Sequence, residues 1–124
     1  MAHITAYVFV LLTVLLTVYG QIVIKWQVLA AGSLPLAAGD RATFVAKLLI
    51  NPWVMSGLGA ALIASACWML AMTKLPLSHA YPFMSLSFVL VLLLSFGVFA
   101  EPLTWQKMLG VALIVAGVVL GSQG

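Results

Sequence analysis

Hydrophobic and polar positions along this chain are arranged in long blocks rather than in the short alternation of a surface strand. Mostly apolar runs of about 20 residues or more are separated by shorter segments that hold the charged side chains. A helix of that length spans the hydrocarbon core of a bilayer. The pattern therefore predicts four transmembrane helices, over residues 4–29, 53–72, 77–100 and 103–121. The first run is too long for a secretory signal and is expected to be retained as a helix.

The longest connection, residues 30–51, has a pattern of its own. It begins with a turn around Gly32 and Pro35, and basic and apolar residues then alternate over residues 41–50. Asp40 stands where it can cap a helix over that stretch. Because a helix with one basic face and one apolar face lies in the membrane interface, we expect an interfacial amphipathic helix here.

Composition strengthens the membrane assignment and excludes several classes of function. Hydrophobic residues make up 65% of the chain and charged residues 6%, and the mean hydropathy is +1.27. A soluble domain carries about 25% charged residues. We therefore expect residues 1–124 to form a single transmembrane domain of the all-α class, with no room for a nucleic-acid-binding or catalytic domain outside the membrane.

The few charges predict how the chain is threaded. Four crossings place both termini and Lys74 on one membrane face. The opposite face then receives Lys25, Arg41, Lys47, Glu101 and Lys107. Since loops rich in Lys and Arg stay in the cytoplasm, that second face is expected to be cytoplasmic.

Polar residues in the first helix recur at helical spacing and share one stripe. They are Thr13, Thr17, Gly20, Gln21 and Lys25. Polar groups are costly in lipid, so the stripe is expected to line the bundle interior or a cavity. A simpler interpretation also stands, in which both threonines bond to their own helix and Lys25 extends to the lipid headgroups.

The third helix carries a second group of polar residues around a proline. Pro82 has no backbone N–H, so a kink is expected there, either static or serving as a hinge or ligand contact. Tyr81 and Ser85 are candidate substrate contacts beside it, although Tyr81 also suits an interfacial aromatic belt. His79 is expected to be solvated near the outer surface.

Glu101 is the one carboxylate next to a transmembrane end, and it falls on the same face as Lys25. The two residues are expected to pair or to line a polar entrance, with a solvated turn residue before Pro102 as the alternative. Metal-ligand clusters, nucleophile triads and phosphate-binding glycine loops are absent from the sequence. We therefore expect neither an enzyme nor a metal or cofactor site.

Small residues that recur on one face of a helix predict close helix packing. The second helix has Ser56, Ala60 and Ala64, and the fourth has Gly110, Gly117 and Gly121. One set is expected to pack within the subunit and the other, assigned here to the three glycines, in a dimer interface. A dimer is expected because four helices are too few to enclose a transport pathway.

Nearly the whole chain resembles the four-helix members of the drug/metabolite transporter superfamily, which include the small multidrug resistance proteins. The resemblance rests on Gly20 with Lys25, Leu75-Pro76, Ala80-Tyr81 with Ser85, and Gly110 with Leu113-Ile114 and Gly117. It implies a small multidrug resistance-like bundle. The drug exporters carry a membrane-embedded glutamate three residues before Gly20, where this chain has Thr17, and Met84 replaces an expected aromatic residue. A proton-coupled exporter of cations is therefore disfavoured.

A better match is the branch similar to the subunits of the undecaprenyl-phosphate-aminoarabinose flippase. Gly20-Gln21 with Lys25, Ala80-Tyr81-Pro82, residues 85–88 and Glu101-Pro102 carry this resemblance. It implies a flippase subunit in the bacterial inner membrane that moves a lipid-linked sugar, as a homodimer or as a heterodimer with a related four-helix chain. The substrate-binding residues are then expected to be Lys25, Gln21, Thr17, Tyr81, Ser85, Glu101 and Arg41.

If the chain is such a flippase subunit, the cations available for a phosphate are Lys25, Arg41 and Lys47. Glu101 is available for a sugar hydroxyl or amine. Two alternatives remain. One is a small-cation exporter that uses Glu101 in place of the missing acid, and the other is an assembly subunit that transports nothing itself.

Overall fold

The computed structural model describes residues 2–123, and the described chain is helical with no strand. Its elements in order are α1 (Ala2–Ala31), α2 (Ala38–Leu49), α3 (Pro52–Met72), α4 (Leu77–Ala80), the 3₁₀ segment η1 (Tyr81–Ser85), α5 (Leu86–Phe99) and α6 (Trp105–Ser122). Within residues 2–123, four helical segments are long and apolar enough to cross a membrane, at Ile4–Ala31, Pro52–Met72, Leu77–Phe99 and Trp105–Ser122. The prediction of a four-helix membrane protein is therefore confirmed.

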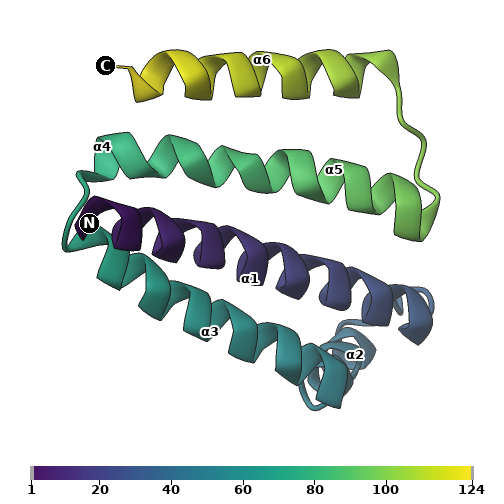
Figure 1. Ribbon diagram of the computed structural model, residues 1–124. Coiled ribbons are helices and arrows are strands. Elements are labelled where there is room, and N and C mark those ends of the chain that lie inside the picture. The colour runs from purple at the N-terminus through teal and green to yellow at the C-terminus, as the bar shows by residue number, and fades with distance from the viewer. Residues whose placement is uncertain (1, 124) are drawn as a thin grey trace.

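The long helices lie side by side in the order α3, α1, α5, α6 (Figure 1). Both ends of the described chain lie at the end of the bundle that holds α4. The other end holds α2 and the turn from α5 to α6 (Figure 1). This arrangement agrees with the predicted threading, which puts the termini and Lys74 at one end and Lys25 and Glu101 at the other.

Polar caps fix where two of the helices begin. The Asn51 side chain accepts hydrogen bonds from the backbone N–H groups of Trp53 and Val54, and Pro52 occupies the first turn of α3. The Thr104 hydroxyl accepts from the N–H of Lys107 at 3.2 Å. The fourth helix therefore begins at Trp105, two residues later than predicted, because Thr104 serves as its cap.

A helix forms in the segment predicted to be amphipathic, but its predicted start was wrong, and its place in the membrane interface stays a prediction. Helix α2 begins at Ala38, and Ala37 occupies the cap position without a side-chain hydrogen bond. Asp40 lies inside the first turn instead of capping it. An acidic group there still stabilises the helix through the dipole. Gly32, at a φ of 92°, allows the preceding turn.

The third membrane-spanning segment changes helix type at Pro82, and the predicted kink itself stays a prediction. Pro82 lies in the first turn of η1, where the backbone tightens from α to 3₁₀ geometry before α5 resumes the α-helix. Pro82 cannot donate a backbone hydrogen bond, which explains the break in the regular ladder at this point.

Helices α1 and α3 make the closest contact in the bundle. A Cβ atom added to Gly20 would lie 3.0 Å from the carbonyl oxygen of Gly57, so the backbones meet where neither residue has a side chain. Ala60 and Ala64 are buried at the same interface. The small residues of the second membrane helix therefore pack within the chain. By contrast, α5 buries no residue and α6 only Val118.

Candidate functional site

A groove of about 580 Å³ lies between α1, α5 and α6. We call it the α1/α5/α6 groove. Its polar lining comes mainly from the predicted stripe on α1 and from the end that holds the turn between α5 and α6. The polar lining residues are Thr17, Gln21, Ser87, Ser95, Glu101 and Lys107. Aliphatic and aromatic side chains of α5 and α6 complete the walls, so a molecule in the groove meets both polar and apolar surfaces.

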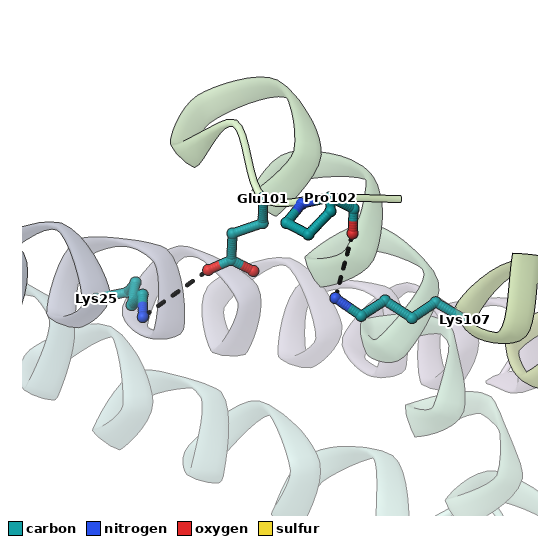
Figure 2. A network of polar contacts seen from close by, with 4 residues as sticks. All are labelled: Lys25, Glu101, Pro102 and Lys107. Carbon is teal, nitrogen blue, oxygen red and sulfur yellow. Dashed lines mark hydrogen bonds and ion pairs between the residues drawn. The ribbon is translucent and has the colours of Figure 1, made fainter. Parts of the chain in front are cut away.

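An ion pair stands at the end of this groove, where Glu101 is a lining residue and Lys25 is not. The Glu101 carboxylate lies 3.8 Å from the Lys25 ammonium, and Lys107 reaches back to donate to the carbonyl oxygen of Pro102 at 3.2 Å (Figure 2). The side chains of Lys25 and Glu101 are 48% and 39% exposed. The predicted pairing of these two residues is therefore confirmed, and the alternative of an unpaired turn residue is not.

The backbone conformation at Ala100 directs the Glu101 side chain toward α1. Ala100 ends α5 in the left-handed region, with a φ of 53°, and it is the one non-glycine residue with a positive φ in the described chain. The N–H of Glu101 then donates to the carbonyl of Ser95 at 3.2 Å, which closes the end of the helix. The reversed chain direction turns the carboxylate back toward Lys25.

The ion pair is easily separated. A half-exposed pair at this distance contributes about 0–1 kcal/mol to stability, because water screens the attraction and two long side chains must be held in place. A charged ligand can therefore replace either partner at little cost, provided that it brings a charge of the same sign.

Several polar groups in the groove have no hydrogen-bond partner among residues 2–123. They are the hydroxyls of Thr17 and Ser95 and the amide of Gln21. In contrast, the Thr13 hydroxyl donates to the carbonyls of Phe9 at 2.8 Å and Ala64 at 3.3 Å. Thr13 thus follows the simpler interpretation of the stripe, whereas Thr17 does not. Because unsatisfied polar groups are costly at membrane depth, the groove favours a polar ligand.

Tyr81 belongs to a different cavity. It lines a pocket of about 470 Å³ between α1, α3 and η1, together with Trp68 and Met84. The rings of Trp68 and Tyr81 meet edge to face at 6.1 Å. Thr17 lines this pocket as well as the α1/α5/α6 groove, so it is the residue that joins Tyr81 to the charged site.

The structure does not bring the remaining predicted contacts to the groove. Arg41 is exposed on α2, where its Nε–H donates to the carbonyl of Pro35 at 2.8 Å. Ser85 lies at the end of η1 and lines neither cavity. Their proposed roles in substrate binding stay predictions.

The three glycines of the predicted dimer interface have different surroundings in the structure. Gly110 lines the α1/α5/α6 groove. Gly117 and Gly121 are exposed, and a Cβ atom added at either position would meet nothing within 4 Å. Their role in dimerisation stays a prediction.

Two polar pairs were missed by sequence reasoning. The Asn51 amide donates to Gln27 Oε1 at 3.1 Å, and Gln27 is 9% exposed. An Asn before Pro is a recognisable cap signal, which could have identified Asn51. His79, expected to be solvated, is partly buried and lies 2.7 Å from the Tyr7 hydroxyl. No local signal links residues so far apart in sequence.

Comparison with known proteins identifies the family of this chain. No solved structure matches it. The chain is 38% identical over 116 residues to a probable 4-amino-4-deoxy-L-arabinose-phosphoundecaprenol flippase subunit ArnF of Aeromonas hydrophila, covering 92% of this chain and 77% of that protein. A subunit ArnE of the same description from Pseudomonas paraeruginosa is 36% identical, with 89% and 90% covered.

An ArnF subunit of an Enterobacter species, with the same description, is 34% identical over 119 residues, which cover 92% of this chain and 91% of that protein. These relatives are named as flippase subunits and not as enzymes. The model of the EamA-like transporter family matches residues 1–123, and the chain, a multi-pass membrane transporter subunit, belongs to that family.

Proposed function

We propose that this chain is one subunit of a flippase that moves a polyprenyl-phosphate-linked amino sugar across the bacterial inner membrane. The observation that carries the proposal is the weak, half-exposed pair of Lys25 and Glu101 at the end of a groove with unpartnered polar groups. The names of the curated relatives supply the substrate class.

The headgroup of such a lipid matches the pair chemically. It carries an anionic phosphate at one end of the sugar and a cationic amine at the other. Lys25 binds the phosphate and Glu101 binds the amine, so each protein charge exchanges one partner for another. No charge is left unpaired at membrane depth, where an isolated charge is costly. A small-cation exporter is less well supported, because Glu101 already has a cationic neighbour.

The uncharged parts of the lipid also find complementary surfaces. Thr17, Gln21 and Ser95 offer hydrogen bonds to the sugar hydroxyls. The polyprenyl tail stays in the bilayer against the exposed apolar faces of α5 and α6. Helix α2 lies in the membrane interface, where Arg41 and Lys47 attract the anionic headgroup before it enters the groove.

A second subunit completes the groove. Helices α5 and α6 bury almost nothing within the chain, and the polar lining between α1, α5 and α6 remains open on one side. Polar groups facing lipid are costly, so a partner that covers them is favoured. The partner is a second copy or a related four-helix chain, and the face with Gly117 and Gly121 allows it to approach closely.

Substitutions of Lys25 test the proposal. Translocation of polyprenyl-phosphate-linked aminoarabinose is measured in vesicles that contain each variant and any required partner chain. We expect Lys25→Gln and Lys25→Ala to slow translocation about tenfold or more, because a hydrogen bond to a charged group contributes about 1.5–3 kcal/mol. Lys25→Arg keeps a cation and retains part of the activity.

Lys74→Gln is the matched control, since it removes a cation from the turn between α3 and α4, and α4 lies at the end of the bundle opposite to α2 (Figure 1). It should translocate the lipid as the unmodified chain does. Wild-type translocation by Lys25→Gln would remove Lys25 from the site and contradict the proposal.

A further inference from the structure

A second polar cavity lies on the other side of α1. It measures about 530 Å³ and lies between the C-terminal end of α1, helix α2 and the start of α3. It shares no lining residue with the α1/α5/α6 groove. Gln27, which lines this cavity, stands two residues after Lys25 and is therefore turned about 200° around the helix from it. We call this cavity the α2 pocket.

The orientation of the Gln27 amide follows from the helix cap. Asn51 Oδ1 accepts from the N–H groups of Trp53 and Val54 at 2.9 and 3.4 Å, which requires its Nδ2 group to face Gln27. Gln27 must then present Oε1 to Asn51. Its Nε2 group has no partner among residues 2–123, although the side chain is nine-tenths buried. The Nε2 group is therefore a free hydrogen-bond donor at the accessible surface of the α2 pocket.

Two charged residues line the same pocket and are unpaired. Lys47 lies toward the end of α2 that leads to Asn51, and Asp40 lies seven residues earlier, about 10 Å along the helix axis. The one ion pair within residues 2–123 joins two other residues. The pocket therefore has a donor-rich cationic end, formed by Gln27 and Lys47, and an anionic end at Asp40.

We propose that the α2 pocket binds a zwitterionic lipid headgroup that carries a phosphate and a primary ammonium. The phosphate is held by Lys47 and the Gln27 amide, and the ammonium by Asp40. Phosphatidylethanolamine and a lipid-linked amino sugar both have this chemistry. Phosphatidylcholine does not, because its quaternary nitrogen has no N–H to donate to Asp40. The inference is independent of what the α1/α5/α6 groove transports.

Lipid retention by the full chain tests the site. The protein, purified in mild detergent with its partner where one is required, is offered equal amounts of phosphatidylethanolamine, phosphatidylcholine and phosphatidylglycerol, and bound lipid is counted by native mass spectrometry. We expect phosphatidylethanolamine to be retained most. Lys47→Gln should lower its retention about tenfold, whereas Lys74→Gln, which removes a cation outside the pocket, should not change it.

The variant Asp40→Asn distinguishes binding at this site from a general attraction of the protein for anionic lipids. It should abolish the preference for phosphatidylethanolamine over phosphatidylglycerol, because the ammonium loses its carboxylate. Displacement of phosphatidylethanolamine by an equal amount of polyprenyl-phosphate-linked aminoarabinose would identify the transported lipid as the occupant, and no displacement would identify the bulk lipid. Equal retention by Lys47→Gln and the unmodified chain, or phosphatidylcholine held as well as phosphatidylethanolamine, would overturn the proposal.

Discussion

Thr13 and Thr17 lie one turn apart on α1, yet their hydroxyls serve different purposes. Thr13 donates to two backbone carbonyls and is buried, whereas Thr17 faces the α1/α5/α6 groove without a partner. We expect Thr13→Val to lower the free energy of unfolding by about 0.6–1.7 kcal/mol, the range for hydrogen bonds between membrane helices. Thr17→Val should leave that free energy unchanged and slow translocation. Unfolding in mixed micelles and vesicle transport measure the two effects, and equal loss of stability in both variants would contradict the assignment.

The spacing of these polar residues predicted that they share a face, and Thr17 and Gln21 do line the α1/α5/α6 groove together, whereas Lys25 meets it only through its pair with Glu101. The spacing did not distinguish the hydroxyl that bonds to its own helix from the one that faces the groove. That choice depends on the side-chain rotamer and on which carbonyl of α3 lies opposite. The pairing of Lys25 with Glu101 was predicted only as one of two outcomes, because it depends on the left-handed turn at Ala100, for which a non-glycine residue gives no signal.

At the scale of the element, the contact of α1 with α3 depends on two glycines that face each other. A methyl group at Gly20 would press against the carbonyl oxygen of Gly57, which is backbone and cannot move aside. Gly20→Ala should therefore lower the free energy of unfolding by about 1–3 kcal/mol, as overpacking does. Gly59→Ala on α3 is the control, because an added Cβ meets nothing within 4 Å there. If both variants unfold alike in a thermal scan, the close packing is not what stabilises this pair.

The long helices were predicted well because length and hydropathy alone decide whether a segment can span a bilayer. The start of α2 was missed because Ala37, Ala38 and Gly39 carry neither a cap nor an amphipathic pattern. The break at Pro82 was expected from the missing N–H. The length of the 3₁₀ stretch was not, because it depends on the packing of η1 against its neighbours.

At the scale of the whole molecule, the exposed Gly117 and Gly121 face of α6 predicts a dimer. Gly117→Leu should hold the two backbones apart and weaken the dimer about tenfold or more, since overpacking costs about 1–3 kcal/mol. Val119→Leu, two residues further and turned to another side of α6, should have little effect. Native mass spectrometry from lipid nanodiscs measures the dimer fraction. A monomer that transports in such bilayers would refute the prediction.

The threading of the chain was predictable because hydrophobic runs and charged turns alternate without ambiguity. The order α3, α1, α5, α6 was not, because hydropathy says which segments cross the membrane and not which ones are neighbours (Figure 1). The groove was therefore predictable as a polar stripe on α1. Its other walls, on α5 and α6, became visible only in the folded chain.

Translocation of two lipids that differ in one group tests the proposed function most directly. The lipids are polyprenyl-phosphate-linked aminoarabinose and the same lipid with a hydroxyl in place of the amine, compared in vesicles with the partner chain present. The unmodified protein should move the amino lipid about tenfold faster, because Glu101 pairs with the ammonium. Glu101→Gln should remove that preference while still moving the hydroxyl lipid. If the unmodified chain moves both lipids equally, or if Glu101→Gln keeps the full preference, the ion pair is not the headgroup site.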